Sequence, residues 1–258
     1  MRLQAKKTIM VGDKVLGGEN PLICIPLTSK DELSLEREME KAIDLSPDVI
    51  EWRVDYFDKS SDVNKVNKAL EILRNNAKDI PMIFTCRSYM EGGFKKVEDE
   101  NKLELVKHAI QSGNVDIVDI ELSFGKRNID YIKSLTVKHN VALIISYHNF
   151  KETPSEEDIV EIIKEEIKKG ADIAKIAAMP NNQEDVLKLM SATLIAKKAI
   201  DNPIITMSMG SLGVISRVAG WIFGSDLTFA AGEKASAPGQ LPIRNLKMLM
   251  EVLLKVQD

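Results

Sequence analysis

The sequence predicts an α/β protein, a (β/α)8 TIM barrel. Eight short apolar runs recur at similar intervals, and the segments between them show the 3.6-residue periodicity of amphipathic helices. Alternating strands and helices indicate a parallel sheet, and eight regular units favour a closed barrel over a doubly wound open sheet. With 258 residues, 44% of them hydrophobic, the chain can fill one large core, so we expect a single domain, 1–258.

The eight predicted strands are largely apolar runs of seven to nine residues. They span residues 21–27, 48–55, 81–87, 115–122, 141–148, 171–179, 203–209 and 226–232. Two of the predicted helices are clear. Residues 31–45 carry Leu33, Leu35, Met39 and Ile43, which we expect to form one apolar stripe. Residues 155–170 begin with Ser155 as an N-cap, continue with acidic residues and end in lysines before a glycine.

Residues 1–20 precede the eight repeats. The stretch "KKTIMVGDKVLGG" indicates two short strands around Gly12 and Asp13, which is a hairpin signal. We expect this N-terminal hairpin to close the bottom of the barrel, at the N-terminal ends of the strands.

Composition excludes several function classes. The net charge is −4 and basic residues form no block, which argues against a nucleic-acid partner. No apolar run approaches the roughly 20 residues that span a membrane, and the N-terminus lacks the apolar stretch of a signal peptide. Cys24 and Cys86 lie in separate apolar runs and are expected to be buried thiols in a reducing, cytoplasmic compartment. No spacing of Cys or His indicates a metal site, and no cofactor motif is present.

The chemistry of such barrels lies at the C-terminal ends of the strands, so polar residues there are candidates. Alternation along residues 48–55 places Glu51, Arg53 and Asp55 on the inward face. Arg87 ends the next predicted strand, and Glu91 follows it in a loop. Taken alone, Arg87 could be a surface cation and Glu91 an ordinary loop carboxylate.

The following strands add two carboxylates and a histidine. Asp119 and Glu121 share the inward face, where ion pairs with the inward arginines are a better expectation than direct catalysis. His148 ends residues 141–148. The two other histidines, His108 and His139, fall within predicted helices. His148 alone is therefore placed to exchange protons in the barrel mouth.

The stretch "GADIAKIAAMP" contains a lysine within a predicted strand. Alternation places Lys175 on the inward face with Ile173 and Ala177, and small alanines leave room for a ligand. Low dielectric disfavours a charged ammonium, and a neutral amine attacks ketones and aldehydes. The sequence therefore predicts a lysine that forms a Schiff base. The alternative is an edge lysine whose charged end reaches water, but a closed barrel has no edge.

Two more segments lie at the same end of the barrel. After residues 203–209, Gly210 and Gly213 begin a helix that carries Arg217, and this start could bind an anion. Residues 232–242 are rich in Gly, Ala, Ser and Pro and present Ser236 and Gln240. This segment is either a lid or an ordinary surface loop.

Together these residues predict an enzyme that acts on an anionic carbonyl compound. Three arginines suit a carboxylate, Lys175 suits a ketone, and His148 suits proton transfer. A Schiff-base aldolase would use the same lysine, and a non-catalytic binding protein could keep the pocket. The presence of both Lys175 and His148 argues against the second alternative.

The sequence resembles the type I 3-dehydroquinate dehydratases over nearly its whole length. The segments that carry the resemblance are "EWRVD", "CRSYMEGG", "SYHNF", "ADIAKIAAMP", "ITMSMGSLGVISRVAG" and "KASAPGQ". The resemblance implies a homodimer of TIM barrels that acts in the shikimate pathway to aromatic amino acids. It also implies that the enzyme uses no cofactor or metal and converts 3-dehydroquinate to 3-dehydroshikimate and water.

Carried over by position, the family's functional residues fall on the candidates above. Lys175 matches the imine-forming lysine, His148 the general acid and base, and Glu91 the carboxylate that orients the histidine. The residues that match substrate-binding groups are Glu51, Arg53, Arg87, Arg217, Ser236 and Gln240. One departure is Pro26, which stands where some members have a substrate-contacting serine. Thr28 or Ser29 could replace that serine only in part.

Overall fold

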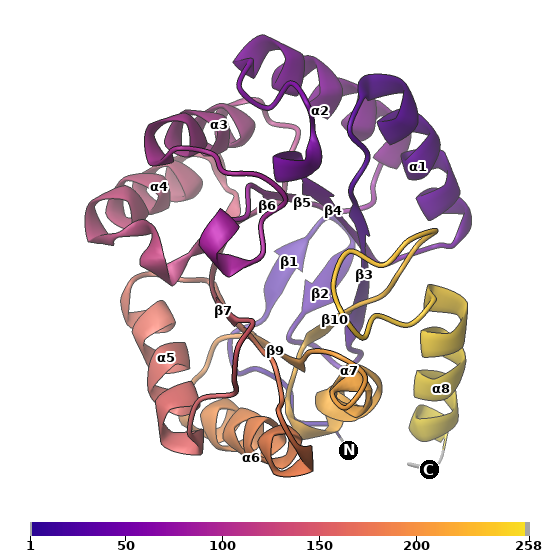
Figure 1. Cartoon of the computed structure of the whole chain (residues 1–258), viewed down its shortest axis with the longest axis vertical. Coiled ribbons are helices and arrows are strands. Elements are labelled where there is room, and N and C mark those ends of the chain that lie inside the picture. Colours follow the sequence, from indigo (N-terminus) through magenta and orange to yellow (C-terminus); the bar gives the residue numbers. More distant parts are fainter. Residues whose placement is uncertain (1, 256–258) are drawn as a thin grey trace.

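The computed structural model describes residues 2–255 and is an eight-stranded parallel barrel surrounded by helices (Figure 1). Residue 1 and residues 256–258 of the predicted domain lie outside the described part. The barrel strands are β3 (Leu22–Leu27), β4 (Val49–Arg53), β5 (Met82–Thr85), β6 (Ile117–Glu121), β7 (Ala142–Asn149), β8 (Ile173–Ala178), β9 (Ile204–Ser208) and β10 (Leu227–Phe229). Each falls within a range that the sequence predicts, except that β7 extends one residue further, to Asn149.

The sheet closes where β9 meets the start of β10. The ladder runs in the order β10-β3-β4-β5-β6-β7-β8-β9, and a parallel bridge joins Ile204 to Ser225 across the remaining gap. The backbone N–H of Asp226 donates to the carbonyl of Ile204 at 2.7 Å. This closure confirms the predicted (β/α)8 barrel and rules out the open doubly wound sheet.

Helices form the outer ring. They are α1 (Glu32–Asp44), α2 (Val63–Ala77), α3 (Asp99–Gln111), α4 (Lys126–His139), α5 (Glu156–Lys168), α6 (Gln183–Ala199), α7 (Val214–Ala219) and α8 (Ile243–Lys255). The predicted cap of α5 is confirmed, since the Ser155 side chain accepts from the N–H of Asp158. Within residues 2–255, no helix is both long and apolar enough to cross a membrane.

The apolar stripe of α1 differs from the prediction at one position. Leu35, Met39 and Ala42 are buried, whereas Leu33 is 58% exposed. Residues two apart lie about 200° apart around a helix, so Leu33 and Leu35 cannot face the same side. The predicted single stripe was therefore wrong for Leu33.

The N-terminal hairpin forms as predicted and covers the bottom of the barrel. β1 (Ile9–Val11) pairs antiparallel with β2 (Lys14–Leu16), and Gly12 makes the turn with a φ of 57°. Val11 and Leu16 pack in one cluster with inward residues such as Val49 and Ile173. Figure 1 shows the hairpin, faint because it is distant, through the centre of the ring.

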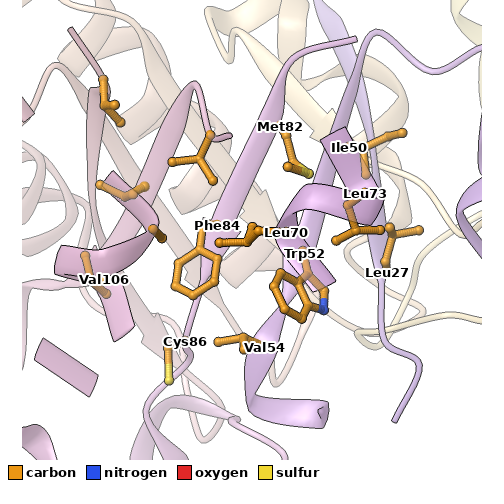
Figure 2. Close-up of a cluster of buried hydrophobic side chains, with 14 of the residues drawn as sticks. Leu27, Ile50, Trp52, Val54, Leu70, Leu73, Met82, Phe84, Cys86 and Val106 are labelled. Atoms are coloured by element: carbon orange, nitrogen blue, oxygen red, sulfur yellow. The ribbon is translucent and has the colours of Figure 1, made fainter. Parts of the chain in front are cut away.

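The barrel wall separates two apolar layers. On the outer face, Trp52 and Phe84 pack against helix residues such as Leu70 and Leu73 (Figure 2). On the inner face, apolar residues fill the lower half, and the polar residues follow them toward the strand C-termini. The buried, unpaired thiols of Cys24 and Cys86 belong to the inner and outer layers respectively, as expected of buried thiols. The apolar floor leaves the upper half of the barrel for polar chemistry.

Candidate active site

A pocket lies at the C-terminal ends of the barrel strands, opposite the hairpin. All nine residues that the sequence selects as site candidates line it. They are Glu51, Arg53, Arg87, Glu91, His148, Lys175, Arg217, Ser236 and Gln240. They come from β4, β7 and β8, from the segments that follow β5 and β10, and from α7, so the barrel closure is what brings them together.

Lys175 lies on the inward face of β8, between Ile173 below it and Ala177 above it. Its Nζ donates to Oδ2 of Asp119 at 2.7 Å and lies 3.9 Å from Oε1 of Glu51. The same nitrogen lies 4.3 Å from the centre of the Phe229 ring. Lys175 therefore points into the pocket, but as the cation of a buried ion pair rather than as an isolated amine.

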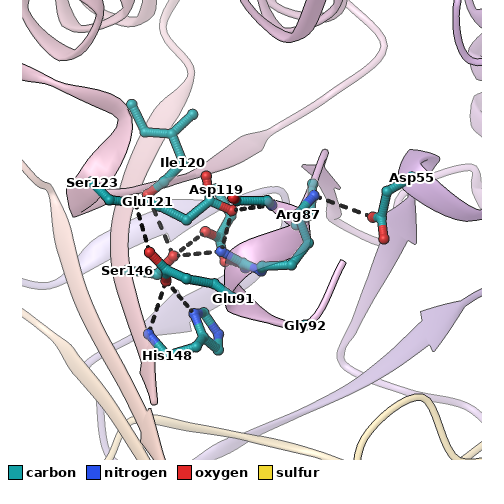
Figure 3. Close-up of polar contacts among 12 residues, drawn as sticks. Asp55, Arg87, Glu91, Gly92, Asp119, Ile120, Glu121, Ser123, Ser146 and His148 are labelled. Atoms are coloured by element: carbon teal, nitrogen blue, oxygen red, sulfur yellow. Dashed lines mark hydrogen bonds and ion pairs between the residues drawn. The ribbon is translucent and has the colours of Figure 1, made fainter. Parts of the chain in front are cut away.

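Arg87 joins the carboxylates of β6. Its guanidinium donates to Asp119 and to Glu121, each at 2.8 Å, and to the Ser146 hydroxyl, as Figure 3 shows. These pairs confirm that the two carboxylates bind an inward arginine. Burial alone raises the pKa of Asp119, but Arg87 and Lys175 outweigh burial and hold this pKa far below its usual range. Asp119 is therefore a fixed negative charge.

A third cation, after Arg87 and Lys175, reaches this network from outside the barrel. Lys102 of α3 is only 3% exposed, and its Nζ contacts the second carboxylate oxygen of Glu121. Burial lowers the pKa of Lys102 to about 8. Glu121 thus bridges Lys102 and Arg87. No sequence pattern predicts this contact, because it depends on how α3 packs on β6.

His148 and Glu91 form the proton-transfer candidates of the pocket. Oε2 of Glu91 accepts from the backbone N–H of His148 at 2.9 Å and lies 3.3 Å from its Nδ1 (Figure 3). The Ser123 hydroxyl donates to the other oxygen at 2.7 Å. Burial, and then the positive charges of Arg87 and Lys175, hold the pKa of His148 well below its usual range. The imidazole is therefore neutral and able to accept a proton.

Arg53 and Arg217 differ in their partners. Arg53 donates two hydrogen bonds to Asp55, at 2.9 and 2.8 Å. Arg217 is 1% exposed and, within residues 2–255, forms no ion pair. Its contacts are the carbonyls of Pro238 and Phe229 and the sulfur of Met207, and its Nε has no partner. Burial lowers the pKa of Arg217 to about 10. A buried guanidinium without a carboxylate is suited to binding an anion.

The segment between β10 and α8 lies over the pocket, inside the ring of helices in Figure 1. Ser236 and Gln240 bind each other on it, because the side-chain carbonyl of Gln240 accepts from the backbone N–H of Ser236 at 2.7 Å. A Cβ at Gly239 would come within 2.2 Å of the Gly210 carbonyl, so only glycine permits this approach. The segment therefore rests on Gly210 and Arg217 at the anion-binding candidate.

Pro26 lies on β3, beside Glu51 of β4. The N–H groups of Thr28 and Ser29 donate to the carboxylate of Glu38 on α1, at 2.9 and 2.8 Å. These two residues line a groove beside α1 and not the pocket that contains Lys175. Neither Thr28 nor Ser29 therefore places a hydroxyl in the pocket where the serine would stand.

Sequence reasoning missed some pocket residues. Phe229 could have been found, because alternation places it inward after Leu227. Phe150 lies one position past β7, and a Cβ on Gly92 would come within 2.3 Å of its ring. That contact depends on two loops and leaves no pattern in the sequence. The ion pair between Lys175 and Asp119 also could not be predicted, because it depends on the register of β8 and β6 within the barrel.

Comparison with known proteins gives a consistent result. The model of the type I 3-dehydroquinase family matches residues 23–256. The chain is 43% identical to the 3-dehydroquinate dehydratase of Aromatoleum aromaticum, over 94% of each protein.

Two crystal structures are also similar over nearly the whole chain. One is the 3-dehydroquinate dehydratase of Geobacillus kaustophilus, with a TM-score of 0.97, 39% identity and 100% of each chain covered. The other is the type I enzyme of Clostridium difficile with covalent modified comenic acid, with a TM-score of 0.93 and 40% identity over 97% of this chain and 98% of that one. The chain therefore belongs to the type I 3-dehydroquinase family.

Proposed function

We propose that the chain dehydrates 3-dehydroquinate to 3-dehydroshikimate and water, through an imine on Lys175. Family membership supports a hydro-lyase of the shikimate pathway that acts on this substrate. The observation that supports the imine is a buried lysine in a pocket that also contains a neutral histidine. The same pocket contains an arginine that forms no ion pair within residues 2–255. Such a pocket suits a ketone that also bears a carboxylate.

The first step is addition of the Lys175 amine to the C3 ketone of the substrate. Because Nζ is paired with Asp119, the ammonium must first lose a proton. Asp119 is held as an anion by its ion pairs with Arg87 and Lys175, so we assign the proton to the neutral imidazole of His148. The proton that His148 accepted then passes to the hydroxyl of the adduct, which leaves as water. This gives a protonated imine and returns His148 to its neutral form, and the positive nitrogen draws electrons from the neighbouring carbon.

The second step is elimination. His148 removes the C2 proton, and the electron pair of that C–H bond forms an enamine with the imine nitrogen. The enamine expels the C1 hydroxyl, which leaves as water with a proton from His148. Hydrolysis of the remaining imine consumes one water and returns Lys175 as an amine. Glu91 keeps His148 in place through these steps, because it contacts both the backbone N–H and the Nδ1 of that residue.

The other candidates hold the substrate. Arg217 binds the substrate carboxylate together with Ser236 and Gln240 from the segment above it. Glu51, Arg53 and Arg87 bind the hydroxyl groups and the ring. The buried guanidinium of Arg217, which lacks a carboxylate within the described residues, supports this role. In the relative from Clostridium difficile, covalent modified comenic acid is a precedent for a covalent adduct in this family.

A substrate panel tests the reaction. We expect purified protein to convert 3-dehydroquinate to 3-dehydroshikimate, seen by ultraviolet absorbance of the conjugated product, and to leave sugar phosphates uncleaved. Cleavage of a sugar phosphate without dehydration of 3-dehydroquinate would identify a Schiff-base aldolase instead.

We also propose that one barrel domain forms a homodimer in the cytoplasm. The resemblance supports the dimer, and neighbouring α7 and α8 expose Ile215, Met248 and Val252. Light scattering during gel filtration should give twice the mass of one chain. The mass of one chain at micromolar concentration would contradict the dimer.

A further inference from the structure

Glu166 is a buried carboxyl group behind Lys175, on the helix side of the barrel wall. α5 turns Ile159 and Ile163 toward β8, and Glu166 continues this stripe at the spacing i, i+4, i+7. Its exposed fraction is 0%. A position on this stripe ordinarily carries an apolar side chain, so the carboxyl group has to be explained.

The carboxyl group of Glu166 binds the backbone of Lys175. Its Oε2 accepts from the Lys175 N–H at 2.9 Å. Its Oε1 has no hydrogen-bond partner among residues 2–255. Glu166 is thus tied to the one residue of β8 that the proposed reaction modifies.

Glu166 also differs in charge from the other buried carboxyl groups near it. Asp119 and Glu121 each contact a cation, whereas within residues 2–255 Glu166 forms no ion pair. Burial raises the pKa of Glu166 well above its usual range, and the charge of Asp119 adds to this rise. The neutral acid can therefore hold the Lys175 peptide without adding a negative charge that would stabilise the ammonium.

The position of Nζ depends on the peptide that Glu166 holds. The backbone at Lys175 sets the direction of its Cα–Cβ bond, and the side chain must reach Asp119 on β6 across the barrel. Burying a carboxyl group with an unpartnered oxygen disfavours folding. A methionine at this position would avoid that cost but would leave the Lys175 N–H without its acceptor.

We propose that Glu166 is a positioning residue for Lys175. Its carboxyl group fixes the Lys175 peptide, so that Nζ lies beside Asp119 and is directed at the substrate ketone. This inference rests on the imine proposed above, and it predicts that Glu166 affects formation of the imine more than binding of the substrate.

The test compares Glu166→Met, Glu166→Gln and wild type. Timed borohydride quenching with 3-dehydroquinate, followed by peptide mass, measures the rate of adduct formation on Lys175. Methionine matches the length of the side chain but removes the acceptor, so we expect adduct formation and kcat to fall about 10- to 100-fold, with KM changed less than about threefold. Glutamine keeps an acceptor oxygen and should restore most of the rate.

A matched control is Ile163→Ala, which loosens the same face of α5 and leaves the Glu166 contact in place. We expect this variant to lose thermal stability but keep the wild-type rate of adduct formation. If Glu166→Met does not fold, Glu166→Asp, whose carboxyl is too short to reach the peptide, takes its place.

Three results would overturn the proposal. They are a wild-type rate in folded Glu166→Met or Glu166→Asp, an equal loss in Glu166→Gln, and an equal loss in Ile163→Ala. Absence of any Lys175 adduct in wild type would instead refute the proposed imine itself.

Discussion

His148 and Glu91 are joined at two points. One carboxylate oxygen of Glu91 accepts from the backbone N–H of His148 at 2.9 Å and lies 3.3 Å from its Nδ1. The carboxylate therefore fixes both the backbone and the ring of the proposed acid and base, and the hydroxyl of Ser123 fixes the carboxylate in turn.

Removing this carboxylate should impair proton transfer without abolishing it. In Glu91→Ala the imidazole can rotate, and we expect kcat to fall about 10- to 100-fold, which is part of the 10² to 10⁴ that positioned acid–base catalysis supplies. Steady-state kinetics with 3-dehydroquinate measures the loss. An unchanged kcat would show that Glu91 does not orient His148.

Removing the imidazole should stop the reaction after the imine forms. In His148→Ala we expect kcat to fall about 10²- to 10⁴-fold, while borohydride still traps some substrate on Lys175. Full activity in this variant would remove His148 from the mechanism.

The pH dependence follows from the buried imidazole. Burial and the charges of Arg87 and Lys175 lower the pKa of His148, so the base stays neutral below the ordinary histidine range. We expect kcat/KM to remain constant as the pH falls through about 6.5 and to decline only at lower pH. An acid limb centred at or above that pH would contradict the neutral base.

The lowered pKa of His148 also affects the stability of the folded protein toward unfolding. The unfolded chain binds a proton at this histidine near pH 6.5, whereas the folded chain does not, so unfolding becomes easier as the pH falls below about 6.5. His148→Gln should weaken this dependence in denaturant unfolding. Identical pH dependence of the two proteins would show that His148 keeps an ordinary pKa.

Arg217 should favour substrate binding at the expense of stability. Arg217→Met removes a buried guanidinium without an ion pair within residues 2–255, so we expect a higher melting temperature. KM should rise about 10- to 100-fold, because hydrogen bonds to charged groups contribute about 1.5–3 kcal/mol. An unchanged KM would remove Arg217 from the carboxylate site.

Arg53 offers the matched control. Arg53→Met leaves Asp55 buried without its cation, so the free energy of unfolding should fall by about 3–5 kcal/mol. Opposite shifts in melting temperature for the two arginine variants are therefore expected.

Strand alternation could predict much of this site from the sequence. It places Lys175, His148, Arg53 and Glu51 inward because a barrel strand has one inner and one outer face. Closure of the barrel then brings the strand ends together, and all of them line the pocket.

Contacts between separate elements could not be predicted this way. Lys102 reaches Glu121 from α3, and Glu166 reaches the Lys175 peptide from α5, so each contact depends on how a helix packs on the wall. Burial is the one influence on the charge of Lys175 that the sequence indicates, whereas the structure provides Asp119 as its counterion.

The central claim is that Lys175 forms an imine with the substrate. Borohydride reduction in the presence of 3-dehydroquinate, followed by peptide mass, tests it most directly. We predict one covalent adduct on the peptide that contains Lys175, and no adduct in Lys175→Ala, which should be inactive. An adduct on another lysine, or an active wild-type enzyme without any adduct, would contradict the claim.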